Sequence, residues 1–171
     1  MYVAAADVDT TTLFQGDVIK DFPFYILEKS QPIRRNEAGL FEQDGDLESE
    51  HSLHAVESNK QSVMILSQSC DLQRRKNIVV CPVYGLDQFI IDNTINADSA
   101  RSIRDRKNNY LFYLPAFADL PESIADLQTM LYVPRAFLIN YLPQRMTSLS
   151  DLGRHHLGWT LASFFGRPVE K

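Results

Sequence analysis

The chain has 171 residues, of which 44% are hydrophobic, and this length and composition suit a single domain with a buried core. Its 17 basic and 22 acidic residues give a net charge of -5, which argues against a general nucleic-acid coat and restricts nucleic-acid contacts to local basic patches. No apolar run approaches the roughly 20 residues needed to cross a bilayer, and the N-terminus lacks the pattern of a secretory signal. The sequence therefore predicts a cytoplasmic protein without a membrane partner.

The cysteine content is low. Cys70 and Cys81 are too few for a disulfide framework, and in a reducing compartment both are expected to be free thiols. Whether they are neighbours in space depends on strand register, which the sequence leaves open.

The first regular element is predicted to follow a short N-terminal segment. Residues 1–12 are small and polar without a clear period, so we expect a loose arm. A turn at Phe14–Asp17 then enters a strand that extends to about Glu28 and is rich in bulky side chains. Pro23 indicates that this strand lies at a sheet edge or bends.

Residues 36–58 are predicted to form an acidic insertion. The segment has no lysine or arginine and contains Glu37, Glu42, Asp44, Asp46, Glu48, Glu50 and Glu57. Leu40 and Phe41 could form a short strand of a hairpin. His51 and His54 could join the carboxylates in a metal or partner site, but acidic runs poor in aromatic residues usually stay solvated. We therefore expect a solvated insertion and no bound metal or cofactor.

The centre of the chain is the apolar run Val63–Leu66, which ends in the polar loop Ser67–Asp71. A buried strand that leads into a polar loop is a common position for functional groups. A basic turn at residues 73–77 and a β-rich run at Ile78–Tyr84 follow, and together these segments predict a hairpin.

A second basic group lies further along the chain. If residues 97–107 form a helix, Arg101, Arg104 and Lys107 share a face that could bind phosphates or could pair with the acidic insertion. The sequence favours neither alternative. Residues 110–115 and 122–134 predict two further strands, and residues 135–142 are compatible with a strand or a turn.

The last predicted element is a C-terminal helix over residues 148–165. Ser148 and Asp151 have the spacing of a capping box, and Gly166 with Pro168 ends the pattern. One predicted apolar face contains Leu152, His156, Trp159, Thr160 and Phe164, beside Leu157 and Leu161. His155 and His156 lack a matching second set of ligands, so we expect no zinc site here.

The polar loop at Ser67–Asp71 has three interpretations. Cys70 could be a nucleophile that a histidine activates and Asp71 orients. Alternatively, Ser67, Ser69 and Asp71 cap turn amides while Cys70 packs as a small hydrophobe, which is the interpretation we favour over catalysis. In the third, Gln68, Ser69 and Asp71 line a groove that binds RNA or a peptide, and this uses the polarity of the loop best.

The order of these motifs resembles the PemK/MazF-type family of small SH3-like β-barrel proteins, best known as toxins that cleave RNA. The resemblance covers residues 16–165 and consists of short segments in a shared order. They are Gly16–Val18, Val63–Ser67, Ile78–Val83, Asp126–Gln128 with Val133 and Arg135, and Arg145–Ser150 with the helix after it. The resemblance implies a mainly β fold with helices: a small SH3-like barrel of five to seven strands and a C-terminal helix.

Two departures from the family pattern concern the chemistry. The ribonucleases of the family place an arginine just before the central strand and a hydroxyl residue after the proline-ending strand, where this chain has Gln61–Ser62 and Val83–Tyr84. The arginine would stabilise charge on phosphorus, and the hydroxyl would help to move a proton. Arg34, Arg35, Arg74 and Arg75 are the nearby substitutes in sequence.

Two functional hypotheses follow. The first is an RNA-recognising protein, in its catalytic form a toxin-type endoribonuclease that needs no metal or cofactor. Its catalytic candidates are Asp71, Ser69, Cys70 and Arg74, and its nucleic-acid-binding candidates are Arg74, Arg75, Arg101, Arg104, Lys107 and Gln68. The second is a non-catalytic protein-interaction module of a bacterial toxin-antitoxin or phage-defence system. An antitoxin-like partner and a homodimer are both compatible with the sequence.

Overall fold

The computed structural model describes residues 1–4, 7, 9, 11–35, 41–43, 53–91 and 96–166. The chain divides into two compact units, one made of residues 1–22 and 61–171 and the other of residues 23–60. Two long strands, β1 (Val18–Arg35) and β3 (Leu53–Ile65), contribute residues to both units. Residues 36–40 and 44–52 of the predicted acidic insertion lie outside the described residues, and Leu53–Ser58 belong to β3 rather than to a loop.

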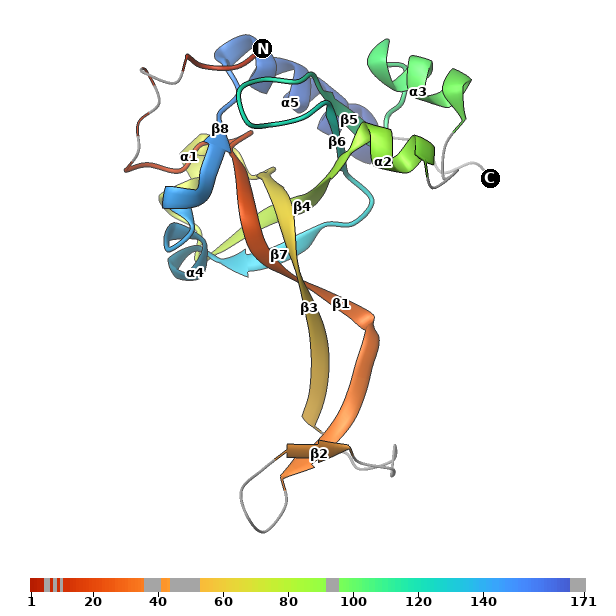
Figure 1. The fold of residues 1–171 in the computed structure, drawn as a ribbon. Coiled ribbons are helices and arrows are strands. Elements are labelled where there is room, and N and C mark those ends of the chain that lie inside the picture. Colours follow the sequence, from red (N-terminus) through yellow and green to blue (C-terminus); the bar gives the residue numbers. More distant parts are fainter. Residues whose placement is uncertain are drawn as a thin grey trace. The chain divides into compact units, whose positions relative to one another are not determined.

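Six further strands complete the described sheet: β2 (Phe41–Gln43), β4 (Asn77–Gly85), β5 (Leu111–Leu114), β6 (Ser123–Asp126), β7 (Leu131–Pro134) and β8 (Arg145–Thr147). The strand order is β2-β1-β3-β4-β6-β5, with β7 paired to β4 and β8 paired to β1. In the smaller unit, β2 pairs antiparallel with the end of β1, from Ile33↔Gln43 to Arg35↔Phe41. In the larger unit, the strands form a curled antiparallel sheet (Figure 1).

Strand β4 is the centre of the larger unit. Its first residues pair with β7, its middle residues pair with β3, and its last residues pair with β6. Valine, isoleucine and cysteine side chains along β4 are buried, as expected for a strand that is covered on both faces. The predicted hairpin is confirmed, because β3 and β4 pair antiparallel from Ser62↔Val83 to Ile65↔Val80.

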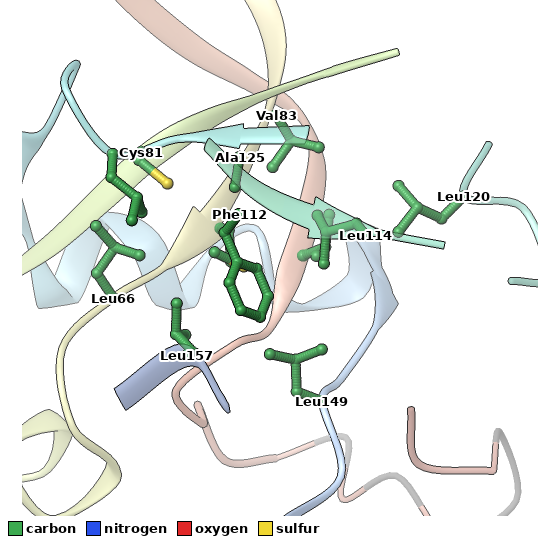
Figure 2. Close-up of a cluster of buried hydrophobic side chains, with 12 residues drawn as sticks. Leu66, Cys81, Val83, Phe112, Leu114, Leu120, Ala125, Leu149 and Leu157 are labelled. Carbon is green, nitrogen blue, oxygen red and sulfur yellow. The ribbon is translucent and has the colours of Figure 1, made fainter. Parts of the chain in front are cut away.

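The main core lies between the sheet and the C-terminal helix. Its buried side chains come from β3, β4, β5 and the residues around β6, and Leu149 and Leu157 contribute from the C-terminal segment. Figure 2 shows the ring of Phe112 among these side chains. Cys81 belongs to this cluster and is fully buried, whereas Cys70 is exposed, and both are free thiols. Burial raises the pKa of the Cys81 thiol, so this cysteine is not a reactive thiolate at neutral pH.

The helices are α1 (Ser69–Leu72), α2 (Leu86–Ile91), α3 (Ala97–Arg104), α4 (Arg135–Ile139), the 3-10 turn η2 (Leu142–Gln144) and α5 (Asp151–Phe165). The predicted fold class is confirmed: the protein is mainly β, with a barrel-like sheet and a C-terminal helix. The strand expected within residues 110–115 is present as β5, and the helix considered over residues 97–107 is present as α3 but ends at Arg104. Among the described residues, no helix combines the length and the apolar character that a bilayer crossing requires.

The sequence prediction was wrong for residues 122–142. The single strand expected over 122–134 is split into β6 and β7 by a turn. Asp126 closes this turn, because its carboxylate accepts hydrogen bonds from Gln128 N (2.9 Å) and from Thr129 Oγ1 (2.7 Å). Residues 135–142 were expected to be strand or turn, but they form α4 and the start of η2.

Two predicted details of the C-terminal helix were also wrong. Its N-cap is Ser150 rather than Ser148, and the Ser150 Oγ accepts a hydrogen bond from Gly153 N (3.3 Å). The predicted apolar face included Leu152 and Trp159, yet these side chains are 62% and 65% exposed. The buried face of α5 is centred on Gly153 and Leu157.

The first residues of the chain are part of the fold. The sequence predicts a loose arm over residues 1–12, but Tyr2 forms a β-bridge with Leu149 and Val3 N donates to Ser148 O (2.9 Å). The Tyr2 hydroxyl also donates to Pro115 O (2.7 Å). These contacts hold residues 1–3 against the segment that leads into α5.

A buried ion pair fixes the segment that precedes β1. Arg145 Nη1 lies 2.7 Å from Asp17 Oδ2, and the side chains are 4% and 0% exposed. Arg145 also donates to the carbonyl oxygens of Thr12 (2.8 Å) and Asp9, while Asp17 Oδ2 accepts from Phe14 N (2.9 Å). One guanidinium and one carboxylate therefore hold Asp9, Thr12 and Phe14 in place.

We expect Arg145→Met to lower the free energy of unfolding by about 3 to 5 kcal/mol, because it leaves the buried Asp17 carboxylate without its partner. Arg75→Met is the control, since Arg75 pairs with Asp71 at the surface with 70% of its side chain exposed, and it should cost about 0.5 kcal/mol or less. Urea unfolding followed by circular dichroism measures both. Equal losses in the two variants would contradict a dominant role for the buried pair.

Candidate functional site

The polar loop after β3 is held by its serines. Ser67 Oγ accepts a hydrogen bond from Val79 N (2.9 Å), and Ser69 Oγ accepts one from Gln15 N (3.1 Å). Gln15 also donates from Nε2 to Leu66 O (2.8 Å), which ties the loop to the segment before β1. Both serines thus satisfy backbone amides of other segments, Val79 in β4 and Gln15 before β1, whereas the capping interpretation predicted turn amides.

The other predicted catalytic residues of the loop lie at the surface. Cys70 is exposed on α1 rather than packed, and its Sγ is 3.8 Å from Gln68 Oε1. Asp71 pairs with Arg75 at 3.7 Å instead of capping an amide. Arg74 is exposed in the turn that follows α1. The four predicted catalytic residues are therefore neighbours in the chain, with Ser69, Cys70 and Asp71 on α1 and Arg74 in the turn after it.

The described histidine side chains, His155 and His156, contact residues outside the Ser67–Asp71 loop. His155 Nε2 accepts from Trp159 Nε1 (2.9 Å), and His156 Nδ1 is 2.6 Å from Arg106 Nη1. His51 and the side chain of His54 lie outside the described residues. Within the part of the chain that the structure describes, no group of three or more His, Cys, Asp or Glu side chains could hold a metal ion.

The basic residues predicted on α3 lie apart from the loop. In the view of Figure 1, α1 and α4 lie on the left of the larger unit and α3 lies on the right. Arg104 forms a two-pronged pair with Glu122, with Nε to Oε1 and Nη2 to Oε2 both at 2.8 Å. Lys107 pairs with Asp105 at 3.2 Å, and Arg101 is exposed. Carboxylates therefore partly neutralise the charge of this helix, and its cations do not converge with those near α1.

A pocket of about 260 Å³ lies beside α1, and we name it the Arg135 pocket. Its polar lining consists of Thr11, Thr12, Gln73 and Arg135, and its apolar lining consists of Leu13, Leu72 and Ile139. The pocket is thus formed by three parts of the chain: the segment fixed by the Asp17–Arg145 pair, the end of α1, and α4.

Arg135 supplies a hydrogen-bond donor that has no acceptor in the described part of the chain. Its Nε is buried and makes no hydrogen bond there. Its backbone N donates to Lys76 O (2.8 Å), a contact that continues the β4–β7 pairing Asn77↔Pro134. This contact places Arg135 next to the basic turn that carries the exposed residues Arg74, Arg75 and Lys76, which we name the basic rim. A guanidinium, two threonines and an amide, flanked by further cations, can bind an anion such as a phosphate.

The sequence reasoning missed most of this site. Arg135 was noted only for its resemblance to a family strand, and Thr11 and Thr12 fell within the predicted loose arm. One sequence feature does indicate this site: the three consecutive basic residues at 74–76, of which Arg74 and Arg75 are predicted to bind phosphates.

No protein-family model matches the chain, and no curated protein matches it.

The Arg104–Glu122 pair predicts a measurable acid dependence of stability. Hydrogen bonds from Arg104, and then from the Tyr113 hydroxyl (2.6 Å), lower the pKa of Glu122 from 4.5 to about 2. A carboxyl with a depressed pKa stabilises the fold fully above its unfolded value and loses this contribution as the pH falls from 4.5 toward 2. We expect Glu122→Gln to cost about 1 kcal/mol at pH 7 and to lose less further stability between pH 5 and pH 3.

Urea unfolding at pH 7, 5 and 3 measures this effect. Asp105→Asn is the matched control, because Asp105 pairs with Lys107 at the surface with 48% of its side chain exposed, and it should follow the wild-type profile. A Glu122→Gln profile parallel to that of the wild type would contradict the prediction.

Proposed function

We propose that this protein binds RNA and that the Arg135 pocket holds a phosphate of the RNA backbone. The observation that carries this proposal is the guanidinium-bearing residue Arg135 in the lining of a polar pocket that borders three exposed cations.

The chemistry of the lining suits a phosphate better than an apolar ligand. A guanidinium offers several N–H donors in a fixed plane, which matches the oxygens of a phosphate. Threonine hydroxyls and a glutamine amide are among the groups that commonly contact the backbone of nucleic acids. Gln73 provides an amide in the same lining as Arg135, whereas the Thr11 hydroxyl already donates to Asp9 Oδ1 (2.7 Å).

The basic rim supports a chain of phosphates rather than a single anion. Arg74, Arg75 and Lys76 are exposed and follow directly after Gln73 of the pocket. Asp71 is the acidic partner within α1, and it pairs with Arg75 only loosely at 3.7 Å. Because the net charge of the chain is -5, binding should be confined to this surface and should weaken steeply with salt.

The arrangement favours binding over cleavage. Cleavage of RNA by attack of the ribose 2′-hydroxyl needs a base within hydrogen-bond reach and a group that stabilises charge on phosphorus. Arg135 could supply the second, but Ser69 Oγ is engaged with Gln15 N, and the described histidines contact Trp159 and Arg106 instead of α1. The toxin-type endoribonuclease and the antitoxin-bound module that the family resemblance implies stay predictions.

We expect Arg135→Gln to weaken RNA binding about 10-fold, because it removes a charge-assisted phosphate contact. The variant should also lower the slope of the logarithm of affinity against the logarithm of salt by about 1. Fluorescence anisotropy of a labelled single-stranded RNA at several salt concentrations measures both quantities. Arg101→Gln removes an exposed cation from α3 and should bind like the wild type. If wild type fails to bind RNA, or if both variants lose affinity equally, the proposed site is wrong.

We also expect the bound RNA to stay intact. Incubation of a mixed RNA pool with the wild type, in chelator and in added divalent metal, followed by gel electrophoresis, tests this expectation. Cleavage that Asp71→Ala or Arg74→Ala abolishes would establish the endoribonuclease instead, with α1 as its catalytic element.

A further inference from the structure

The outer face of α5 carries two exposed apolar side chains and a shallow hollow. Trp159, the single tryptophan of the chain, is 65% exposed, and Leu152 is 62% exposed. The hollow has a volume of about 520 Å³, and its lining includes Gln15, Arg154, His155, Gly158, Trp159 and Ala162. We name it the α5 hollow.

The indole of Trp159 is held in one orientation over this hollow. Its Nε1 donates to His155 Nε2 (2.9 Å), and the two rings meet edge to face with centroids 6.2 Å apart. Gly158 leaves room beside the indole, because a Cβ built there would meet nothing within 4 Å. A fixed, exposed aromatic ring next to open space is suited to stacking against another flat ring.

The polar groups of the hollow favour a nucleobase over an apolar side chain of a partner protein. Arg154 Nη1 binds Asp151 Oδ1 at 3.0 Å, and its guanidinium lies over the Phe14 ring at 5.1 Å from the centroid. The lining also includes the polar side chains of Gln15, Asp151 and His155. An apolar occupant would leave polar groups of this lining unpaired, whereas a base has both a stacking face and donor and acceptor atoms on its edge.

The α5 hollow and the Arg135 pocket are connected by one short segment. Thr11, Thr12 and Leu13 line the Arg135 pocket, Phe14 contacts Arg154, and Gln15 lines the α5 hollow. We propose that Trp159 is a stacking platform for a base of the RNA whose phosphate lies in the Arg135 pocket. This inference rests on the proposed RNA binding and adds a single-stranded, unpaired base to the ligand that the site takes.

The intrinsic fluorescence of Trp159 tests the platform directly, because no other tryptophan contributes to the signal. A single-stranded RNA decamer is titrated into the full chain while tryptophan fluorescence and the anisotropy of a label on the RNA are followed together. Stacking predicts quenching that saturates at the same RNA concentration as the anisotropy. Trp159→Ala should weaken binding by at least about 5-fold, and Trp159→Phe should restore most of the affinity.

Leu152→Ala is the matched control, since Leu152 is as exposed as Trp159 on the same helix but lies outside the hollow lining. Circular dichroism shows whether each variant is folded. An anisotropy change without quenching, together with wild-type affinity in Trp159→Ala, would overturn the platform and leave RNA binding at the Arg135 pocket intact. The absence of any anisotropy change would overturn both proposals. Equal losses in Leu152→Ala and Trp159→Ala would point to a general apolar contact and would also overturn the platform.

Discussion

The buried pair between Asp17 and Arg145 is the interaction on which both candidate sites depend. A carboxylate removed from water loses its hydration, and this burial is the main cause that raises the pKa of Asp17. The cost is tolerated because Asp17 also accepts from Phe14 N, and Arg145 also donates to Thr12 O. These hydrogen bonds reach residues that are otherwise irregular. The pair therefore fixes a segment without regular secondary structure, and this segment contributes to the lining of both the Arg135 pocket and the α5 hollow.

The backbone of Gly16 also packs closely against neighbouring residues and holds the same segment in place. Gly16 has a φ of +82°, and its N–H donates to Ile65 O (2.8 Å) at the end of β3. A Cβ at this position would lie 2.5 Å from Leu149 Cδ1, so both the backbone angle and the space require glycine. The Gly16–Asp17 step that carries part of the family resemblance thus has a local physical reason. Gly16 contacts the end of β3 and Leu149, which precedes α5, and Asp17 pairs with Arg145.

The sequence predicted what depends on local pattern and missed what depends on distant contacts. The hairpin of β3 and β4 followed from two apolar β-rich runs, whereas the helix at α3 was only assumed when its basic residues were considered. Arg135 was missed because its environment is created by residues 11–13 and 72–73, which no local pattern connects to it. Trp159 was placed on the buried face because α5 is apolar on more than one side, so the helical period did not select which side packs.

The charge distribution is compatible with the proposed binding of a polyanion by an acidic chain. Arg104 at the end of α3 is paired with Glu122, and Lys107 after the helix is paired with Asp105, so carboxylates partly neutralise their charge at the surface. At the basic rim, the ion pairs of the described residues give three consecutive cations one partner, Asp71, and Arg135 adds a fourth cation nearby. The proposed phosphate contact there would weaken with salt, whereas the proposed stacking on Trp159 would depend little on ionic strength. The two halves of the proposed site therefore contribute in different proportions as salt rises, with the indole dominating when the cations are screened.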